Sequence, residues 1–207
     1  MGTAAGPLNG DVVELDVVVR ACARLIVQGA AAMIALPGTG RAPATWALTA
    51  DVGPGARLVC APQPIVVCAG ARLRTRTEVT LGGEASLDLI EQVVLGRFGE
   101  AGGDWTGRLV ADVEGAPVLR QSQSSAVLTA GPRRSGDAAP RAVVSRLLLG
   151  AGGSVSTPTV DGDAVACPLA AGGTLLTAVG PDLGAALRDL DAVSRGAVAR
   201  RPRERGT

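Results

Sequence analysis

The densest group of chemically capable side chains in this sequence is the segment Leu95-Gly96-Arg97-Phe98-Gly99-Glu100. Gly96 and Gly99 permit a tight or left-handed backbone, so the segment is typical of a turn. Arg97 and Glu100 can form an ion pair that fixes this turn, or they can present donors and acceptors to a partner. We favour the structural interpretation, because an apolar run leads directly into the segment.

The chain has no histidine, so carboxylates are the candidates for acid and base catalysis. A pair of carboxylates can hydrolyse a glycosidic bond without histidine. The candidates are Glu91, Glu100 and Asp104, but no spacing in the sequence brings two of them together. A sugar site also needs aromatic walls, and this chain has only two Trp and one Phe. A histidine-free hydrolase is therefore a minor hypothesis.

The composition excludes several classes of site. The sequence contains no His, no Tyr and no Lys, so its 20 basic residues are all Arg. Ser-His and Cys-His nucleophiles, histidine zinc sites, a Walker-A lysine and a Schiff base are all excluded. Scarce aromatic residues and a net charge of +1 argue against nucleic-acid binding. We expect a binding or scaffold protein.

Four cysteines, at positions 22, 60, 68 and 167, contain no Cys-x-x-Cys pair, so a zinc ribbon is not indicated. No targeting signal is evident, and the longest uncharged apolar stretch, 25–36, is too short to span a bilayer. We therefore expect a cytoplasmic protein without membrane contact. In that compartment the cysteines should be buried free thiols.

The elements that position these residues are predicted to be mostly strands. Apolar residues make up 47% of the chain, and 29 Gly with 13 Pro imply frequent turns. A weak glycine-rich repeat recurs roughly every 14 to 15 residues, as at Gly53 to Leu58, Cys68 to Leu73 and Gly82 to Leu87. This spacing suits a strand and its return, and so predicts stacked, meandering sheets, sandwich-like or solenoid-like. Strands are expected at Val12–Val19, 23–27, Ala44–Val52, 58–61, 65–68, Arg72–Leu81, 87–94, 107–113 and 118–124.

Two helices complete the predicted fold. Residues 140–149 follow Asp137 and stop at Gly150, and residues 181–193 place apolar residues at helical spacing behind Pro181. The section 131–140 reads as an exposed loop. We expect one domain over residues 1–194, followed by an arginine-rich disordered tail at 195–207.

Several motifs, in order, resemble the urease accessory protein UreD family (also called UreH). The turn Leu95-Gly96-Arg97-Phe98-Gly99-Glu100 precedes Gly107-Arg108-Leu109 and then Gly115-Ala116-Pro117-Val118-Leu119. Upstream, Val52-Gly53-Pro54-Gly55-Ala56 and the strand entry at Leu81 to Leu87 also match, and Ile34-Ala35-Leu36-Pro37-Gly38 is like the actinobacterial branch. The resemblance covers about residues 20 to 193.

The resemblance implies a scaffold that is not an enzyme. A protein of this family is expected to bind UreF and, through it, the GTPase UreG, and to dock on the urease apoprotein. It would assist nickel delivery to the urease active site, by way of a water-filled tunnel proposed for the family. Nickel would pass only transiently, with no tightly bound cofactor.

One loop departs from the family pattern, because residues 36–46 carry no carboxylate where longer members have an acidic Gly-Gly-Asp loop. Other carboxylates would then serve metal passage, and oxygen ligands hold nickel more weakly than imidazole does. The candidates for inward-facing transit ligands are Asp51, Glu78, Glu91 and Glu100. The alternative hypothesis is a β-rich structural or small-molecule-binding module unrelated to urease.

Overall fold

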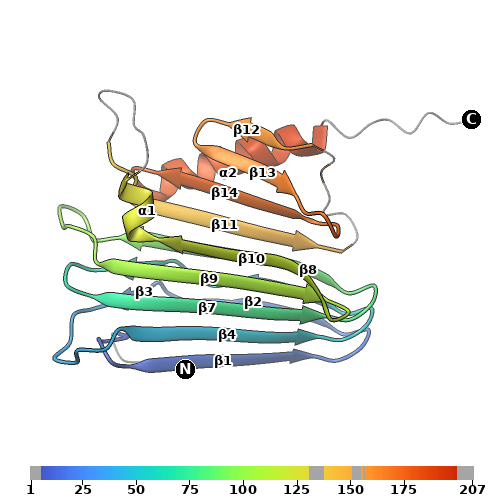
Figure 1. Cartoon of the computed structure of the whole chain (residues 1–207), viewed down its shortest axis with the longest axis horizontal. Helices are drawn as coiled ribbons and strands as arrows, with labels where there is room; N and C mark the ends of the chain where they lie inside the picture. Colours follow the sequence, from blue (N-terminus) through green and yellow to red (C-terminus); the bar gives the residue numbers. More distant parts are fainter. Residues whose placement is uncertain (1–5, 131–137, 151–154, 156, 200–207) are drawn as a thin grey trace, which may run out of the picture.

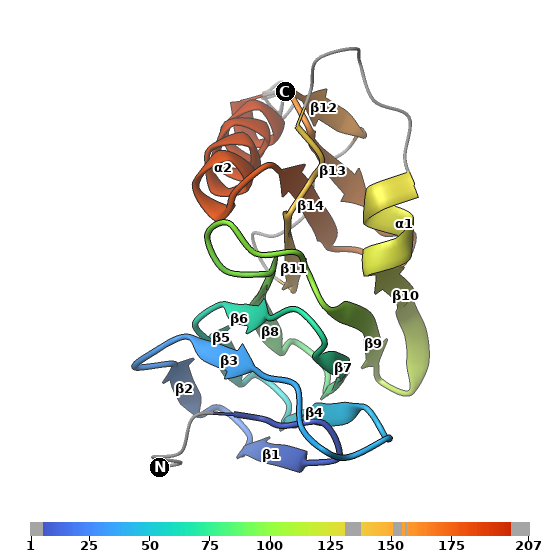
Figure 2. The same cartoon turned by 90° about the vertical axis from the view of Figure 1, so that its left-hand side faces the viewer.

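Two β-sheets face each other, and the first half of the chain winds between them as a solenoid (Figures 1 and 2). The structure is a computed structural model that describes residues 6–130, 138–150, 155 and 157–199. The first sheet has the order β1 (Val12–Val19), β4 (Ala44–Val52), β7 (Arg72–Leu81), β9 (Asp104–Val113) and β10 (Ala116–Ser124). The second has the order β12 (Thr159–Asp161), β13 (Ala164–Pro168), β14 (Thr174–Gly180), β11 (Ala142–Leu149), β8 (Ser86–Leu95), β5 (Arg57–Ala61) and β2 (Arg24–Gln28), with β3 (Met33–Ala35) and β6 (Ile65–Val67) beside it.

The winding follows from alternating side chains. In β7 the row Leu73, Thr75, Thr77, Val79 and Leu81 is buried between the sheets, and the intervening charged residues point outward. Strands β1, β4, β7 and β9 are parallel neighbours, so each must return through the second sheet before the next begins.

Glycine-rich turns stack at the ends of the coils. The Gly55 amide donates to the Gly83 carbonyl at 2.9 Å, and the Gly82 amide donates to the Val52 carbonyl at 2.8 Å. Gly53 and Gly82 therefore mark the same position in consecutive coils, and the predicted repeat is half a coil. The expected meander is wrong in its connectivity, because strands that are neighbours in a sheet lie two repeats apart and run parallel.

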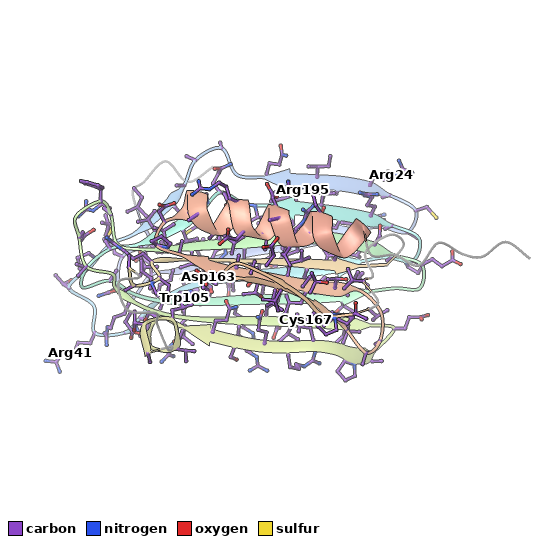
Figure 3. The ribbon with its side chains drawn as sticks, turned by 90° about the horizontal axis from the view of Figure 1, so that it is seen from above. Arg24, Arg41, Trp105, Asp163, Cys167 and Arg195 are labelled. Atoms are coloured by element: carbon purple, nitrogen blue, oxygen red, sulfur yellow. The ribbon has the colours of Figure 1, made fainter. Side chains whose placement is uncertain are left out.

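The second half of the chain extends the second sheet with antiparallel strands. Strand β11 pairs with β8 on one side and β14 on the other, and helix α2 (Leu183–Ala199) covers the outer face of this region (Figure 3). Strand β11 is covered on both faces, so apolar residues lie on each face and only Ser145 and Arg146 interrupt them, without period-two alternation. The predicted helix at 140–149 is therefore wrong, and the residues form β11.

The other predicted elements fare better. Each predicted strand overlaps an observed one, and Val12–Val19, Ala44–Val52 and Arg72–Leu81 match at both ends. The predicted helix at 181–193 is confirmed as α2, which continues to Ala199, so the start of the predicted disordered tail is helical; residues 200–207 lie outside the described residues. Helix α1 (Ser125–Ala130) was not predicted, and most of the predicted loop at 131–140 also lies outside them.

All four cysteines are free thiols, as predicted. Cys60 and Cys68 are buried, whereas Cys167 is half-buried and Cys22 is exposed, so the expected burial holds for two of them. Neither α1 nor α2, the helices of the described residues, combines the length and apolar character needed to cross a membrane.

Replacing Leu147 tests the packing between the sheets. Leu147 in β11 has no exposed surface and packs in the core formed by both sheets. Leu147→Ala should lower the free energy of unfolding by about 2–5 kcal/mol, measured by urea denaturation, because it leaves a cavity. The control Ile26→Ala removes a side chain that is 65% exposed, and its cost should stay within about 0.5 kcal/mol. Equal losses in the two variants would contradict the packing described here.

Candidate functional site

A band of polar side chains crosses the otherwise apolar space between the two sheets. We call it the polar belt and define it by five residues: Thr75, Thr77, Glu91, Gln123 and Ser145. Strand register places them at one level. Glu91 pairs directly with Ser145 across the second sheet, and in the first sheet Gly107 pairs with both Thr75 and Gln123. The belt therefore draws side chains from β7, β8, β10 and β11.

Apolar clusters lie on both sides of the polar belt. Leu89, Leu109 and Leu147 belong to the cluster on one side, and Val93 and Trp105 belong to the cluster on the other. In β7, β8 and β11 the inward-facing row thus runs apolar, polar, apolar along the strand. A continuous apolar row would stabilise the core more, because a buried polar group destabilises the fold unless it is hydrogen-bonded.

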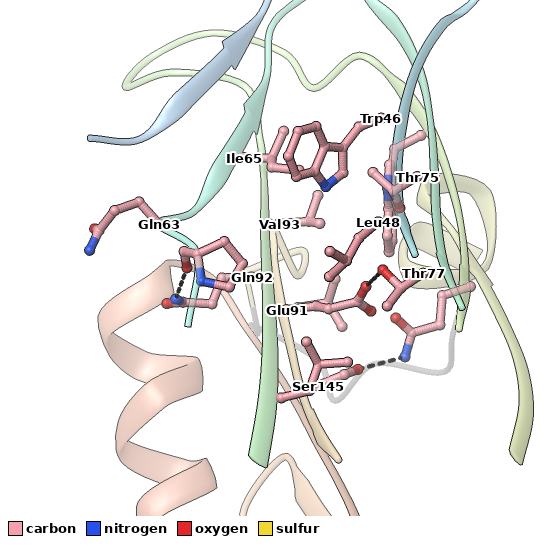
Figure 4. A pocket seen from close by; sticks show the side chains of 15 residues that line it. Trp46, Leu48, Gln63, Ile65, Thr75, Thr77, Glu91, Gln92, Val93 and Ser145 are labelled. Atoms are coloured by element: carbon pink, nitrogen blue, oxygen red, sulfur yellow. Dashed lines mark hydrogen bonds between the residues drawn. The ribbon is translucent and has the colours of Figure 1, made fainter. Parts of the chain in front are cut away.

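The belt surrounds a small cavity of about 30 Å³, which is room for one or two water molecules (Figure 4). Its polar groups are partly paired with each other. The Thr77 hydroxyl donates to the Glu91 Oε1 atom at 2.5 Å, Gln123 Nε2 donates to the Ser145 hydroxyl at 3.2 Å, and Trp105 Nε1 donates to Thr75 Oγ1 at 3.1 Å. Glu91 itself lines the cavity.

A break in the second sheet lies at one side of the cavity. Strand β5 ends at Ala61 and β6 begins at Ile65, and both pair with the continuous strand β8, on either side of Glu91. Pro62 and Pro64 cannot donate to a strand ladder, which explains the interruption. Pro62 and the exposed Gln63 line the cavity there, and Gln92 Nε2 donates to the Pro62 carbonyl at 3.2 Å.

Burial controls the ionisation of the groups inside. Desolvation raises the pKa of the Glu91 carboxyl above its ordinary value, and the hydrogen bond from Thr77 opposes this rise without cancelling it. Glu91 keeps some accessible surface although it lies deep between the sheets, because it borders the cavity. Desolvation, helped by the charge of Glu91, also raises the pKa of the Cys60 thiol to about 11, so Cys60 stays protonated at neutral pH.

The four carboxylates singled out in the sequence lie in three different surroundings. Glu91 alone reaches the cavity between the sheets. Asp51 is exposed on the outer face of β4, and Glu78 lies on the outer face of β7, where Arg76 Nη2 contacts it at 2.5 Å. These positions correct the expectation that Asp51 and Glu78 point inward. Glu100 lies in the turn between β8 and β9.

That turn contains the ion pair expected from the sequence. Arg97 Nε donates to Glu100 Oε2 at 2.9 Å and Arg97 Nη2 donates to Glu100 Oε1 at 3.0 Å, which makes the pair bidentate. The Arg97 amide also donates to Glu100 Oε2 at 3.0 Å. These hydrogen bonds lower the pKa of Glu100 to about 2, so its carboxylate is charged at any physiological pH.

Arg141, at the start of β11, holds the same turn from inside. Its guanidinium donates to the Leu95 carbonyl at 2.9 Å, to the Arg97 carbonyl at 3.0 Å and to the Glu100 carbonyl. Gly96 has φ +78, and a Cβ there would lie 2.6 Å from the carbonyl oxygens of Glu100 and Ala101. The close approach of Arg141 and these carbonyls therefore requires glycine at position 96.

The sequence reasoning missed most of the belt. Thr77, Gln123, Ser145 and the role of Arg141 were not identified, because their meeting depends on pairing between distant strands. One signal was present: Glu91 shares its face of β8 with Leu87, Leu89, Val93 and Leu95, and a carboxylate in an apolar row of period two indicates a special interior position.

The raised pKa of Glu91 predicts a specific pH dependence of stability. The folded state binds the proton of Glu91 more tightly than the unfolded state does, so this contribution is fully present below the ordinary carboxyl pKa and is lost as pH rises through the folded value. Glu91→Gln should abolish this loss of stability with rising pH. At a pH above the folded pKa of Glu91, the variant should be more stable than the parent. Thermal unfolding midpoints measured from about pH 4 to pH 8 test this, with Glu78→Gln as a control that keeps the parental fall. Superimposable profiles for Glu91→Gln and the parent would contradict the burial of this carboxyl.

The contacts of Gly96 can be separated from its backbone strain by comparison with Gly115. Both glycines have φ +78, but nothing lies within 4 Å of a Cβ placed on Gly115. Gly115→Ala should cost about 1–2 kcal/mol of stability from the left-handed backbone alone. Gly96→Ala should cost about 2 kcal/mol more, because the added methyl group displaces Arg141 or the turn carbonyls. Chemical denaturation measures both, and equal losses would show that the packing around Gly96 is looser than described.

Comparison with known proteins places the chain in a family. The model of the family described as UreD urease accessory protein matches residues 1–202. The urease accessory protein UreD of Parafrankia sp. (strain EAN1pec) is 41% identical, over 94% of this chain and 73% of the relative. Its counterpart in Frankia alni is 36% identical over 92% of this chain and 70% of the relative, and that in Streptomyces coelicolor is 35% identical over 88% and 74%. The family model and the relatives agree in description across nearly the whole chain, and this chain therefore belongs to the UreD family of urease accessory proteins.

Proposed function

We propose that this chain is a non-catalytic scaffold for urease maturation, and that it binds UreF, the GTPase UreG through UreF, and the urease apoprotein. Family membership supports this role, because the relatives are described as urease accessory proteins. It also sets aside the alternative of a module unrelated to urease. A two-carboxylate hydrolase lacks support, although Glu100 and Asp104 line one groove. The ion pair with Arg97 lowers the pKa of Glu100 to about 2, which keeps Glu100 charged and unsuited to act as a general acid.

We further propose that nickel on its way to urease passes through the polar belt. The observation that carries this proposal is Glu91, the one carboxylate that lines the cavity in the part of the chain that the structure describes, set in an apolar row and accompanied by hydroxyl groups. Oxygen ligands suit a transient stay, because they bind nickel less tightly than imidazole or thiolate does. The break in the second sheet at Pro62 to Pro64 provides an approach to the cavity.

The raised pKa of Glu91 couples the passage of nickel to the release of a proton. A carboxyl group must lose its proton to bind a cation, so nickel entry would release the proton that burial favours. A buried carboxylate without a counter-charge is destabilised by desolvation. A divalent cation neutralises that charge, so relief of this destabilisation favours its binding. When nickel leaves, the proton returns and the interior is neutral again.

Replacing Glu91 tests the passage without disturbing the assembly surfaces. Glu91→Gln keeps the shape of the side chain and an oxygen that can accept from Thr77, but it removes the charge. In cells that co-express UreF, UreG and urease, the variant should lower the nickel content of purified urease by about tenfold, measured by metal analysis. Glu78→Gln, on the outer face of β7, should leave nickel loading unchanged.

Complex formation should not change in either variant. Size-exclusion chromatography of the chain with UreF and urease should show the same elution for the parent, Glu91→Gln and Glu78→Gln. If urease activated with Glu91→Gln carries its full nickel content, the proposed path through the polar belt is wrong, although the scaffold role could still hold. If the parent chain binds neither protein, the scaffold role itself fails.

A further inference from the structure

The only phenylalanine of the chain, Phe98, is fully exposed in the turn between β8 and β9. The other two aromatic residues, Trp46 and Trp105, line the interior cavity. A phenyl group left in water forgoes the stabilisation that burial of its apolar surface would give. The turn that carries Phe98 projects from the end of the sheets (Figures 1 and 2). An aromatic side chain in this setting is typical of a binding anchor.

The backbone on both sides of Phe98 is held firmly. The bidentate pair of Arg97 and Glu100 closes the turn, and the Glu100 amide donates to the Arg97 carbonyl at 3.1 Å. Arg141 fixes the same turn from below through three carbonyl groups. A rigid anchor loses little conformational entropy on binding, so this arrangement favours recognition.

A groove runs beside the turn and extends the surface available to a partner. It has a volume of about 590 Å³ and is bounded by the turn, by the start of β9 and by α1, with Glu100, Asp104, Ser125 and Thr129 among its lining residues. Asp104 is exposed and accepts a hydrogen bond from Ser125 Oγ at 3.4 Å. No ion pair to Asp104 exists among the described residues, so its charge is available to a basic group.

We propose that Phe98 is the anchor of a protein-binding surface formed by the turn and this groove. Its partner is a separate protein of the maturation assembly that offers an apolar pocket of phenyl size, with a basic side chain on the rim that reaches Asp104. This inference rests on the proposed scaffold function for the choice of assembly. It does not depend on the path of nickel.

A second copy of this chain fits the anchor poorly. A cavity that accepts a benzene ring is of the order of 150 Å³, and the interior cavity offers about 30 Å³. The groove is large enough, but Glu100 and Asp104 line it, and a phenyl ring there would strip water from carboxylates. Neither of these two hollows of the described residues suits Phe98, which favours a different protein as the partner.

The test compares Phe98→Ser with Val127→Ser, a substitution of another strongly exposed apolar residue, on the neighbouring helix α1. Binding of each purified variant to UreF alone, and to urease apoprotein with and without UreF, is measured by biolayer interferometry. Phe98→Ser should weaken one of these interactions by about thirtyfold or more, as expected for an aromatic hot spot. Val127→Ser should bind like the parent, and both variants should unfold at the parental temperature.

Further measurements distinguish failure of the Phe98 anchor from failure of the scaffold function. Asp104→Asn should weaken the interaction that Phe98→Ser weakens, and only that one. If the parent binds but Phe98→Ser binds both proteins equally well, the anchor is refuted while the scaffold function stands. If Phe98→Ser instead abolishes self-association of the parent, seen by light scattering, the occupant is a second copy and the proposal is overturned. If the parent binds neither protein, the scaffold function and the anchor fail together.

Discussion

Strand β8 is the element on which the rest of the structure depends, because it joins two kinds of sheet. On one side it pairs in parallel with β5 and β6, which form the preceding return of the solenoid, and on the other it pairs antiparallel with β11. Its ten residues must therefore satisfy two registers at once. Those registers place Glu91 opposite Ser145 and opposite the break at Pro62 to Pro64. The turn that follows β8 carries Arg97, Phe98 and Glu100, so one strand positions both the interior belt and the exposed anchor.

The polar belt weakens a core that would otherwise be continuous. An apolar side chain at position 91 would pack against Leu89 and Val93 and would avoid the desolvation that raises the carboxyl pKa. Residues that oppose stability in this way are expected where function requires them. The turn differs from the belt, because its contacts add stability. Arg141, Gly96 and the pair of Arg97 with Glu100 stabilise a backbone that holds Phe98 exposed to solvent.

The sequence predicts the strands of the solenoid well because their alternation has period two and glycine-rich turns separate them. It fails at 140–149, where burial of β11 on both faces removes the alternation and the flanking Pro140 and Gly150 imitate helix boundaries. The site is harder to predict for a different reason. Glu91 was among four candidates, but its partners Thr77, Gln123 and Ser145 come from separate strands, and only the sheet registers bring them to one level. Arg141 lies 44 residues from Arg97 in the sequence and contacts it only in the fold.

If nickel passes through the cavity of the polar belt, as we propose, filling that cavity should block the passage. Ser145→Leu would place an apolar side chain in the cavity beside Glu91 while keeping the Glu91 side chain itself and the exposed surfaces. The measurement is the number of nickel atoms per active site in urease activated by the variant in a complete accessory complex, with a crystal structure to establish that the cavity is filled. We expect a normally assembled complex and nickel-poor urease. Fully loaded urease with a filled cavity would show that nickel takes another path.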